Sequence, residues 1–323
     1  MAGFGEGIKH VGQELAYTPE QIRELMKCQS DLFHFLKYVK IVHPDRGRVT
    51  FEPWPYQTEL FKLIQDNRFV IALVARQQGK SVMVAAYLLW YAIFHDDKTL
   101  GVVSNNEEGA IDILDRIKVM YEELPDWLKP GQAEYNKKTI AFENGTKIRA
   151  RATSKDSFRG RTLNICFADE FAFVDPQWKA DEFFTSNWPT ISASKESKFI
   201  IVSTPKGIGN IFHRIYSEAE NNLNTFKHFY ADWSAHPDRD EGWAVEQMAN
   251  MGSRRFNQEF ACVDGPTMVT VRDKDTGIIK DMKIEDLYNI RCLHLDTLCL
   301  GRIIFLRSFL FFDCFCHFTY PVI

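Results

Sequence analysis

The stretch FVIALVARQQGKS, from Phe69 to Ser81, decides the fold prediction. It begins with a continuous apolar run, Phe69–Ala75, whose length suits a strand buried on both faces. A short polar loop follows, and the apolar pattern after it predicts a long helix from Ser81 to Phe94. A strand, a glycine-containing loop and a helix in this order are typical of an α/β protein.

The loop Val74–Ser81, VARQQGKS, has the residue types of a phosphate-binding loop, and we call it the phosphate loop below. Gly79 lets backbone amides curl around phosphates, Lys80 can reach the β- and γ-phosphates, and the Ser81 hydroxyl can bind Mg²⁺. The start of the following helix favours negative charge. Val74 departs from the usual GxxxxGK pattern, which has its first glycine there. Gly-Lys-Ser alone is a common chance tripeptide, but the strand before it and the helix after it favour the functional interpretation.

A second motif, NICFADEFAF from Asn164 to Phe173, is an apolar strand that ends in two acids. Asp169 at a strand tip can hold Mg²⁺ through water, and Glu170 can polarise an attacking water. A solvated Asp-Glu pair at a strand end is the simpler alternative. An apolar strand that follows a phosphate loop makes the functional interpretation stronger, and the two motifs together predict a hydrolase of nucleoside triphosphates.

A third motif, FIIVSTP from Phe199 to Pro205, is a strand that ends in Ser203 and Thr204. A hydroxyl there can bond the γ-phosphate or its attacking water, and so report hydrolysis to the rest of the protein. A turn fixed by Pro205 is an equally good interpretation.

A fourth motif, WPYQTEL from Trp54 to Leu60, precedes the phosphate loop. Tyr56 can stack on a base, and the Gln57 amide can donate to and accept from an adenine edge at once. Taken alone, these two residues are more often the core and surface positions of a helix.

Short apolar strands alternate with helices along the rest of this region, which predicts a mainly parallel sheet flanked by helices. Asn144-Gly145 between alternating segments predicts a hairpin. Thr18, Pro19 and Gln21 form a helix start, with apolar residues at helical spacing as far as Tyr38. The expected elements are strands at 99–104, 139–142, 147–152, 163–168, 198–203 and 225–233, and helices at 107–124 and 208–220.

The bulk properties are those of a globular protein. The chain has 323 residues, a formal net charge of -4, 45% hydrophobic residues and 25% charged residues. No global basic field attracts nucleic acid, so any DNA contact would have to come from a local basic face or an assembled oligomer. The start of the chain lacks a secretory pattern and no CxxC pair occurs, which favours a cytosolic protein with reduced thiols.

The four motifs, in this order and spacing, resemble the ATPase domain of a tailed-phage terminase large subunit. The residues that carry the resemblance are Tyr56-Gln57, Ala75–Ser81, Ala168-Asp169-Glu170 and Ser203-Thr204-Pro205. That family typically has an arginine inside the phosphate loop and lacks its first glycine, so the departure at Val74 supports the resemblance. It covers roughly Leu32 to Cys262.

The resemblance implies a role for each residue. Lys80 and Ser81 would bind phosphates and Mg²⁺, Asp169 would complete the metal site, and Glu170 would be the catalytic base. Arg76 would act as an arginine finger or, alternatively, as a structural clamp on the loop. The remaining expectations are that Gln77, Gln78 and Gly79 contact the nucleotide, that Ser203-Thr204 couple hydrolysis to movement, and that Arg159 and Arg161 are solvated loop charges or contact a neighbouring subunit or a phosphate.

The resemblance also implies partners and cofactors. These are ATP and Mg²⁺, double-stranded viral DNA, the portal protein, the small terminase subunit, and further copies of the chain in a ring on the procapsid. The expected location is the host cytoplasm, transiently at the portal vertex. A complete large subunit has a nuclease domain as well, and the residues after Cys262 show no set of spaced acids for a two-metal site. We therefore expect no nuclease activity from this chain.

The character of the sequence changes at Cys262. The following residues are similar to the start of an intein, with Cys262 as nucleophile, then Gly265, Thr267 and the segment Ile284–Leu287. The alternative is a β-hairpin formed by Met268–Arg272 and Ile278–Met282. A downstream Thr-x-x-His block and a terminal Asn, which splicing needs, are missing, so a second chain would have to supply them.

The expected organisation is therefore a helical segment at 1–50, an ATPase domain at 51–261, an intein-like fragment at 262–288 and an irregular apolar tail at 289–323. The competing functions are a splicing precursor that is inactive alone, a helicase-like nucleic-acid ATPase, and a catalytically dead fragment. Arg76 and the lack of a second ATPase lobe count against the helicase.

Overall fold

The computed structural model describes residues 7–158, 160 and 162–262, together with the backbone of four strands at 268–273, 279–283, 303–307 and 310–312. The chain divides into two compact units, Met1–Asp238 and Arg239–Ile323. The division precedes Cys262, where the sequence suggested a boundary. Among the described residues, no helix has the length and apolar character needed to cross a membrane.

The first unit is built on a mainly parallel sheet, as the sequence predicts. In the described part of the chain its strand order is β10-β3-β9-β8-β4-β7-β6-β5. Strands β10 to β7 run parallel, and β6 and β5 add an antiparallel edge. The bounds are β3 Phe69–Val74, β4 Thr99–Ser104, β5 Gln132–Tyr135, β6 Thr139–Phe142, β7 Lys147–Ala152, β8 Ile165–Asp169, β9 Lys198–Ser203 and β10 Lys227–Ala231.

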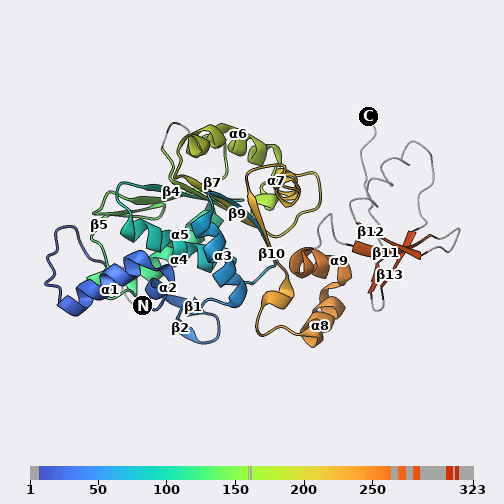
Figure 1. The fold of residues 1–323 in the computed structure, drawn as a ribbon, viewed down its shortest axis with the longest axis horizontal. Helices are drawn as coiled ribbons and strands as arrows, with labels where there is room; N and C mark the ends of the chain where they lie inside the picture. The colour runs from blue at the N-terminus through green and yellow to red at the C-terminus, as the bar shows by residue number, and fades with distance from the viewer. Residues whose placement is uncertain are drawn as a thin grey trace. The chain divides into compact units, whose positions relative to one another are not determined.

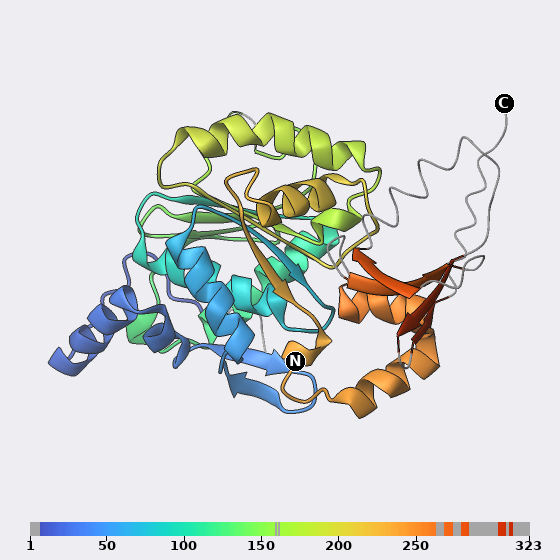
Figure 2. The same cartoon turned by 45° about the vertical axis from the view of Figure 1, so that its right-hand side comes forward.

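Helices cover both faces of this sheet. Figures 1 and 2 show α3 (Pro55–Asp66), α4 (Lys80–Phe94) and α5 (Glu107–Glu122) on one face, and α6 (Trp178–Ala193) and α7 (Ile211–Glu220) on the other. Every residue of β3 is buried, because both faces of this strand are covered. Helix α4 is apolar almost all round and lies in the core, since α2, α3 and α5 pack around it.

Several expected elements end one to three residues away from the prediction, and at two of them a side-chain cap explains the difference. Helix α7 begins three residues late, because the Asn210 side chain caps it by accepting from the backbone N of His213 at 3.0 Å. Strand β10 ends at Ala231, because the Asp232 side chain accepts from the backbone N of Ser234 at 2.9 Å and starts a 3-10 turn, η3 (Trp233–Ala235). Local side-chain capping therefore decides both boundaries.

The base of the sheet holds the end of helix α3. The ammonium of Lys198, the first residue of β9, donates to the backbone oxygens of Ile64, Gln65 and Asn67 at 2.7, 2.9 and 2.9 Å. These carbonyls lie at the C-terminal end of α3, where a helix leaves its last oxygens without intrahelical partners. Burial lowers the pKa of Lys198. One side chain thus fixes α3 to β9.

The N-terminal segment contains α1 (Pro19–Ser30), α2 (Leu32–Leu36) and the hairpin of β1 (Lys40–His43) and β2 (Gly47–Thr50). The helical pattern from Thr18 to Tyr38 predicted no interruption, but the helix breaks at Asp31. That residue is extended, and its side chain accepts from the backbone N of Phe33 at 2.8 Å, so it starts a new helix.

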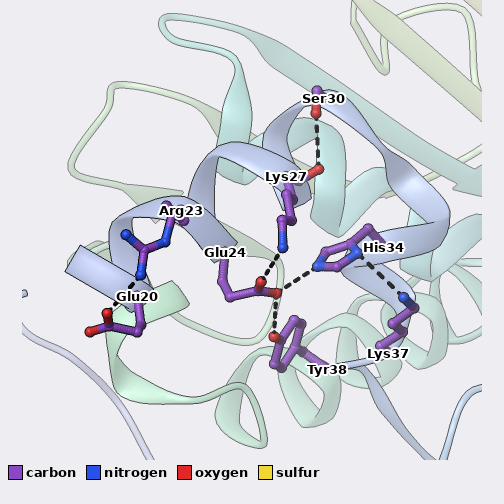
Figure 3. A network of polar contacts seen from close by, with 8 residues as sticks. All are labelled: Glu20, Arg23, Glu24, Lys27, Ser30, His34, Lys37 and Tyr38. Carbon is purple, nitrogen blue, oxygen red and sulfur yellow. Dashed lines mark hydrogen bonds and ion pairs between the residues drawn. The ribbon is translucent and has the colours of Figure 1, made fainter. Parts of the chain in front are cut away.

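The Glu24 carboxylate reconnects the two helices (Figure 3). It accepts from Lys27 at 2.7 Å, from Nε2 of His34 at 2.6 Å and from the Tyr38 hydroxyl at 2.9 Å. Because Glu24 and Lys27 lie on α1 whereas His34 lies on α2, this network fixes the angle between the two helices.

The second unit contains α8 (Glu241–Met251), α9 (Ser253–Phe256) and a π turn, η4 (Asn257–Ala261). Its described strands form an antiparallel sheet of order β12-β11-β13-β14. Strands β11 (Met268–Asp273) and β12 (Ile279–Lys283) pair at the two stretches that the sequence suggested as a hairpin. The stretch 289–323, which we expected to be irregular, holds β13 (Ile303–Arg307) and β14 (Leu310–Phe312).

Candidate nucleotide site

The phosphate loop joins the end of β3 to the start of α4. Gly79 is the N-cap of α4 and has a φ of 70°, in the left-handed region that glycine adopts without steric cost. Lys80 is the first residue of the helix, one position earlier than expected. The first backbone N–H groups of α4 have no intrahelical partner, so this end of the helix favours an anion.

Lys80 and Glu170 face each other across the site. The Lys80 Nζ lies 2.7 Å from Oε1 of Glu170, and the two side chains are 7% and 27% exposed. The Nζ is buried, and its contact with the carboxylate lacks the alignment of a hydrogen bond. The site therefore holds a nearly buried positive charge whose hydrogen-bonding capacity is available to a ligand.

Ser81 and Asp169 form the second contact of the site. The Ser81 hydroxyl donates to Oδ2 of Asp169 at 2.7 Å, and Oδ1 of Asp169 is buried without a hydrogen-bond partner. Burial raises the pKa of Asp169, Lys80 opposes this rise and Glu170 adds to it. A buried carboxylate oxygen without a partner, next to a hydroxyl, fits a hard cation such as Mg²⁺.

The protein supplies only part of a metal shell. No group of three or more His, Cys, Asp or Glu side chains that could hold a metal occurs in the part of the chain that the structure describes. Mg²⁺ usually keeps several waters and takes one or two carboxylates together with substrate phosphates. Ser81 and Asp169 match that pattern, so a cation here would depend on a phosphate ligand.

Glu170 and the end of β9 are in contact. Glu170 directly follows β8 with φ 48° and ψ 40°, a left-handed conformation that costs a residue with a side chain about 1–3 kcal/mol. The Thr204 hydroxyl donates to Oε2 of Glu170 at 3.5 Å. The Ser203 hydroxyl accepts from the backbone N of Ala172 at 3.2 Å and donates to the backbone oxygen of Thr204 at 2.8 Å. Both predicted hydroxyls therefore touch the segment that carries the acid.

A shallow pocket of about 270 Å³ opens beside these acids. Ser81, Asp169 and Glu170 line one side, as the sequence predicts. The other side, which the sequence analysis missed, is the end of β4 and the first turns of α5. The sequence did contain a signal for this side of the pocket, because the polar residues Ser104-Asn105-Asn106 stand at the carboxyl end of a buried strand. The lining residues on that side are Ser104, Asn105, Asn106, Glu108, Gly109, Asp112, Ile113 and Arg116.

Tyr56 and Gln57 lie on the first turn of α3, next to the phosphate loop. They are 6% and 2% exposed. The Tyr56 hydroxyl and Nε2 of Gln57 both donate to the backbone oxygen of Gln78, the latter at 3.1 Å. The structure thus brings them to the loop, and contact with a base stays a prediction.

The other loop residues differ in exposure. Arg76 and Gln77 are exposed, and Gln77 has a φ of 57°. Gln78 is fully buried, and its Nε2 donates to the backbone oxygen of Asp232 at 2.6 Å.

Several predicted residues lie elsewhere. Cys262 is buried at the end of η4, with a φ of 47°. Arg159, Arg161, Gly265, Thr267 and the segment 284–287 lie outside the described residues, so their proposed roles stay predictions.

Comparison with known proteins identifies the family and the fold of the chain. Residues 71–283 match the sequence model of a family described as the terminase large subunit, T4likevirus-type, N-terminal. The chain belongs to this family. The match covers more than half of the chain and runs from β3 to β12. It continues past Cys262, so it marks no boundary there.

Solved terminase structures share the fold of this terminase chain. The Thermus phage P74-26 large terminase ATPase domain is 20% identical with a TM-score of 0.54, over 66% of this chain and 94% of that one. The large terminase of bacteriophage HK97 is 15% identical with a TM-score of 0.60, over 79% and 67%. The large terminase of the thermophilic bacteriophage D6E, in complex with ADP, is 13% identical with a TM-score of 0.54, over 69% and 56%. At these identities the likeness shows the fold.

Proposed function

We propose that the chain is the ATP-hydrolysing motor domain of a phage terminase large subunit. The observation that carries the proposal is the meeting of Lys80, Ser81, Asp169 and Glu170 at the carboxyl edge of one parallel sheet. Ligands of open α/β sheets bind at this edge. The D6E large terminase, which shares the fold, was crystallised with ADP and with ATP-γ-S, in support of a nucleotide ligand.

Each side chain has a role in this proposal. Lys80 binds the β- and γ-phosphates, and Ser81 and Asp169 hold Mg²⁺, which neutralises charge on the phosphates. Glu170 orients the attacking water, and a phosphate that attracts Lys80 weakens the ion pair that now engages Glu170. Thr204 touches Glu170 and can report the change to β9. Arg76 lies exposed at the loop, where it can approach the γ-phosphate as an arginine finger.

We further propose that hydrolysis drives double-stranded DNA into procapsids. This part rests on the family and on the sequence motifs. The proposed partners are the portal protein, the small terminase subunit and further copies of the chain in a ring at the portal vertex in the host cytoplasm. The proposal includes no nuclease activity for this chain.

The intein-like start at Cys262 is a separate proposal that rests on sequence alone. Attack of the Cys262 thiol on the Ala261 carbonyl would convert that amide to a thioester. Complete splicing would also need a second chain that supplies the missing blocks. Incubation with an external thiol tests it. A fragment that ends at Ala261 supports the thioester, and a chain that stays intact contradicts it.

The proposed ATPase is tested by steady-state phosphate release from the purified chain. We expect Glu170→Gln to lower kcat by about 10²–10⁴-fold, the usual effect of losing a general base. Lys80→Ala should abolish saturable hydrolysis, because no other described cation of the loop is buried at the site. Glu59→Gln and Lys62→Ala, exposed positions on α3, are the matched controls and should retain activity. Hydrolysis that survives both site changes would contradict the motor assignment.

A further inference from the structure

One segment of the chain carries a strong local excess of positive charge. Residues 137–156 contain six lysines or arginines and two acids, although the whole chain has a formal net charge of -4. The segment covers β6, β7 and the turns beside them. Because the bulk charge is negative, contact with a polyanion requires a local concentration of positive charge such as this one.

Three of these cations lie on one face of β7. Lys147, Arg149 and Arg151 alternate along the strand and therefore point to the same side of the sheet, and we call them the basic stripe. Between them, Ile148 and Ala150 are fully buried in the hydrophobic core. Helices α4 and α5 pack on that core side. The basic stripe thus lies on the opposite face of β7.

The face that carries the basic stripe is covered by a helix only further along the sheet. Helix α6 packs on β9, where the Phe184 ring stacks on Phe199 with their centroids 5.9 Å apart. Beside the stripe, a loop takes over. Gly101 of β4 is the register partner of Arg149, and a Cβ atom built on it would lie 2.6 Å from the Phe158 ring. Lys147 is exposed and the two arginines are partly exposed, so the stripe stays open to solvent.

The basic stripe has no counter-charge. In the described part of the chain, no carboxylate forms an ion pair with Lys147, Arg149 or Arg151. The Nε of Arg149 is buried and has no hydrogen-bond partner. Neighbouring stripe positions are about 6.6 Å apart along the strand, so their like charges repel each other. Three unpaired cations at this spacing fit a surface that a polyanion neutralises.

Two further lysines lie near the end of the basic stripe. The Lys138 ammonium donates to Glu107 at 2.8 Å. This hydrogen bond lowers the pKa of Glu107, and the charges of Lys138, Arg151 and Lys137 lower it further. Their common action on one carboxylate indicates that the three cations lie close together. A single acid faces all three, so an excess of positive charge remains.

The aromatic residues distinguish between two kinds of nucleic acid. Proteins that hold single strands stack the bases on exposed aromatic side chains. Residues 137–158 contain two aromatic residues, Phe142 and Phe158, and each is 1% exposed. Contacts with phosphates alone are enough to hold a duplex without reading its sequence. The surface therefore suits the backbone of a duplex better than a single strand.

We propose that the basic stripe, together with Lys137 and Lys138, holds the phosphate backbone of duplex DNA independently of its sequence. The inference rests on the proposed function, since duplex DNA is the partner named there, and it goes further by naming the surface. One copy of the chain is sufficient for this contact, without assembly of a ring.

Salt-dependent binding of a fluorescently labelled duplex tests the inference. Anisotropy gives the affinity of the full chain at several salt concentrations for wild type, Lys147→Gln, Arg149→Gln and Arg151→Gln. Each lost contact should reduce the slope of log affinity against log salt by about 1, and weaken binding equally for two unrelated sequences. Arg151→Lys keeps the charge and should keep the wild-type slope. Lys227→Gln, an exposed position on β10 of the same sheet, is the matched control and should bind like wild type.

The outcomes separate the inference from the proposed function. Basal ATP hydrolysis and the urea midpoint should stay at wild-type values in every variant, which shows that a loss of binding is not a loss of the fold. Wild-type slopes in all three glutamine variants of the stripe would overturn the inference and leave the motor assignment standing. An equal loss in Lys227→Gln would overturn it too, because bulk charge would then explain the binding.

Tighter binding of the separate strands, or of polyglutamate, than of the duplex would overturn the inference in favour of single strands or an acidic protein. Should wild type bind no duplex at the lowest salt, the proposed DNA motor itself fails, and the inference with it. Lys147 is exposed, so Lys147→Gln remains informative if the two arginine variants do not fold.

Discussion

At the scale of single residues, Asp169 carries two opposing requirements. Its Oδ1 is buried without a partner and its pKa is raised by burial, so the charged form is costly in the folded protein. The same oxygen is the ligand that the proposed Mg²⁺ site needs. Stability and cation binding therefore oppose each other at this side chain.

Asp169→Asn separates these two requirements. We expect the half-saturating Mg²⁺ concentration for hydrolysis to rise about 10–100-fold, as it does when groups that support a metal are removed. The urea midpoint without Mg²⁺ should stay equal or rise, because the amide removes a buried carboxylate. Magnesium titrations of activity and urea unfolding measure the two effects. Asp181→Asn, exposed on α6, is the control and should change neither. An unchanged Mg²⁺ requirement in Asp169→Asn would remove Asp169 from the metal site.

The positions of the candidate site residues follow from the sequence where they depend on local order along the chain. Asp169 ends a buried strand, Lys80 and Thr204 come after buried strands, and the carboxyl ends of parallel strands meet at one edge. The sequence did not predict the partners of Gln57 or Gln78. The contact between Gln78 and Asp232 depends on β10 lying next to β3, which is a matter of strand order. The contribution of β4 and α5 was missed for the same reason.

At the scale of elements, the Glu24 network joins α1 to α2 across the break at Asp31. Hydrogen bonds from Lys27, then His34, then Tyr38 lower the pKa of Glu24 from 4.5 to about 2. Because the folded-state pKa lies below the unfolded value, the stabilisation is complete above about pH 4.5 and is lost as the pH falls through about 2. The junction of the two helices should therefore be sensitive to acid.

Glu24→Gln tests this expectation. The variant should have a lower urea midpoint than wild type at pH 6, and the difference should shrink steadily between pH 4.5 and pH 2. Urea unfolding across this pH range measures it, with Glu59→Gln as an exposed glutamate control. A difference that is as large at pH 2 as at pH 6 would show that the carboxylate charge contributes nothing to the network.

At the scale of the whole molecule, the net charge of -4 sets a limit on DNA binding. Without a global positive field, the chain should bind a DNA duplex weakly and lose affinity with rising salt, as contacts with phosphates do. The helicase-like alternative would instead act on a single nucleic-acid strand, whereas the proposed motor acts on duplex DNA. Salt dependence and preferred nucleic acid are therefore the informative quantities.

We expect duplex DNA to stimulate hydrolysis more than single-stranded DNA of equal length, with no dependence on sequence. Binding should fall by a constant factor for each doubling of salt concentration, because counterion release makes the relation linear on logarithmic axes. Phosphate release with two unrelated duplexes and with their separate strands measures this. Stronger stimulation by the single strands would favour the helicase-like alternative, and no binding at the lowest salt would contradict the proposal of a DNA motor.

The hydrogen bonds from Lys198 to the end of α3 have a mechanical consequence. Lys198 holds one end of α3, and the other end of α3 holds Gln78 in the phosphate loop. The Lys80–Glu170 ion pair connects this loop to β8, and Thr204 leads from Glu170 back to β9, which begins at Lys198. These contacts therefore form a closed ring that begins and ends at β9. A displacement of the phosphate loop or of Glu170 cannot be absorbed by one strand alone, so it is transmitted to α3 and β9 together.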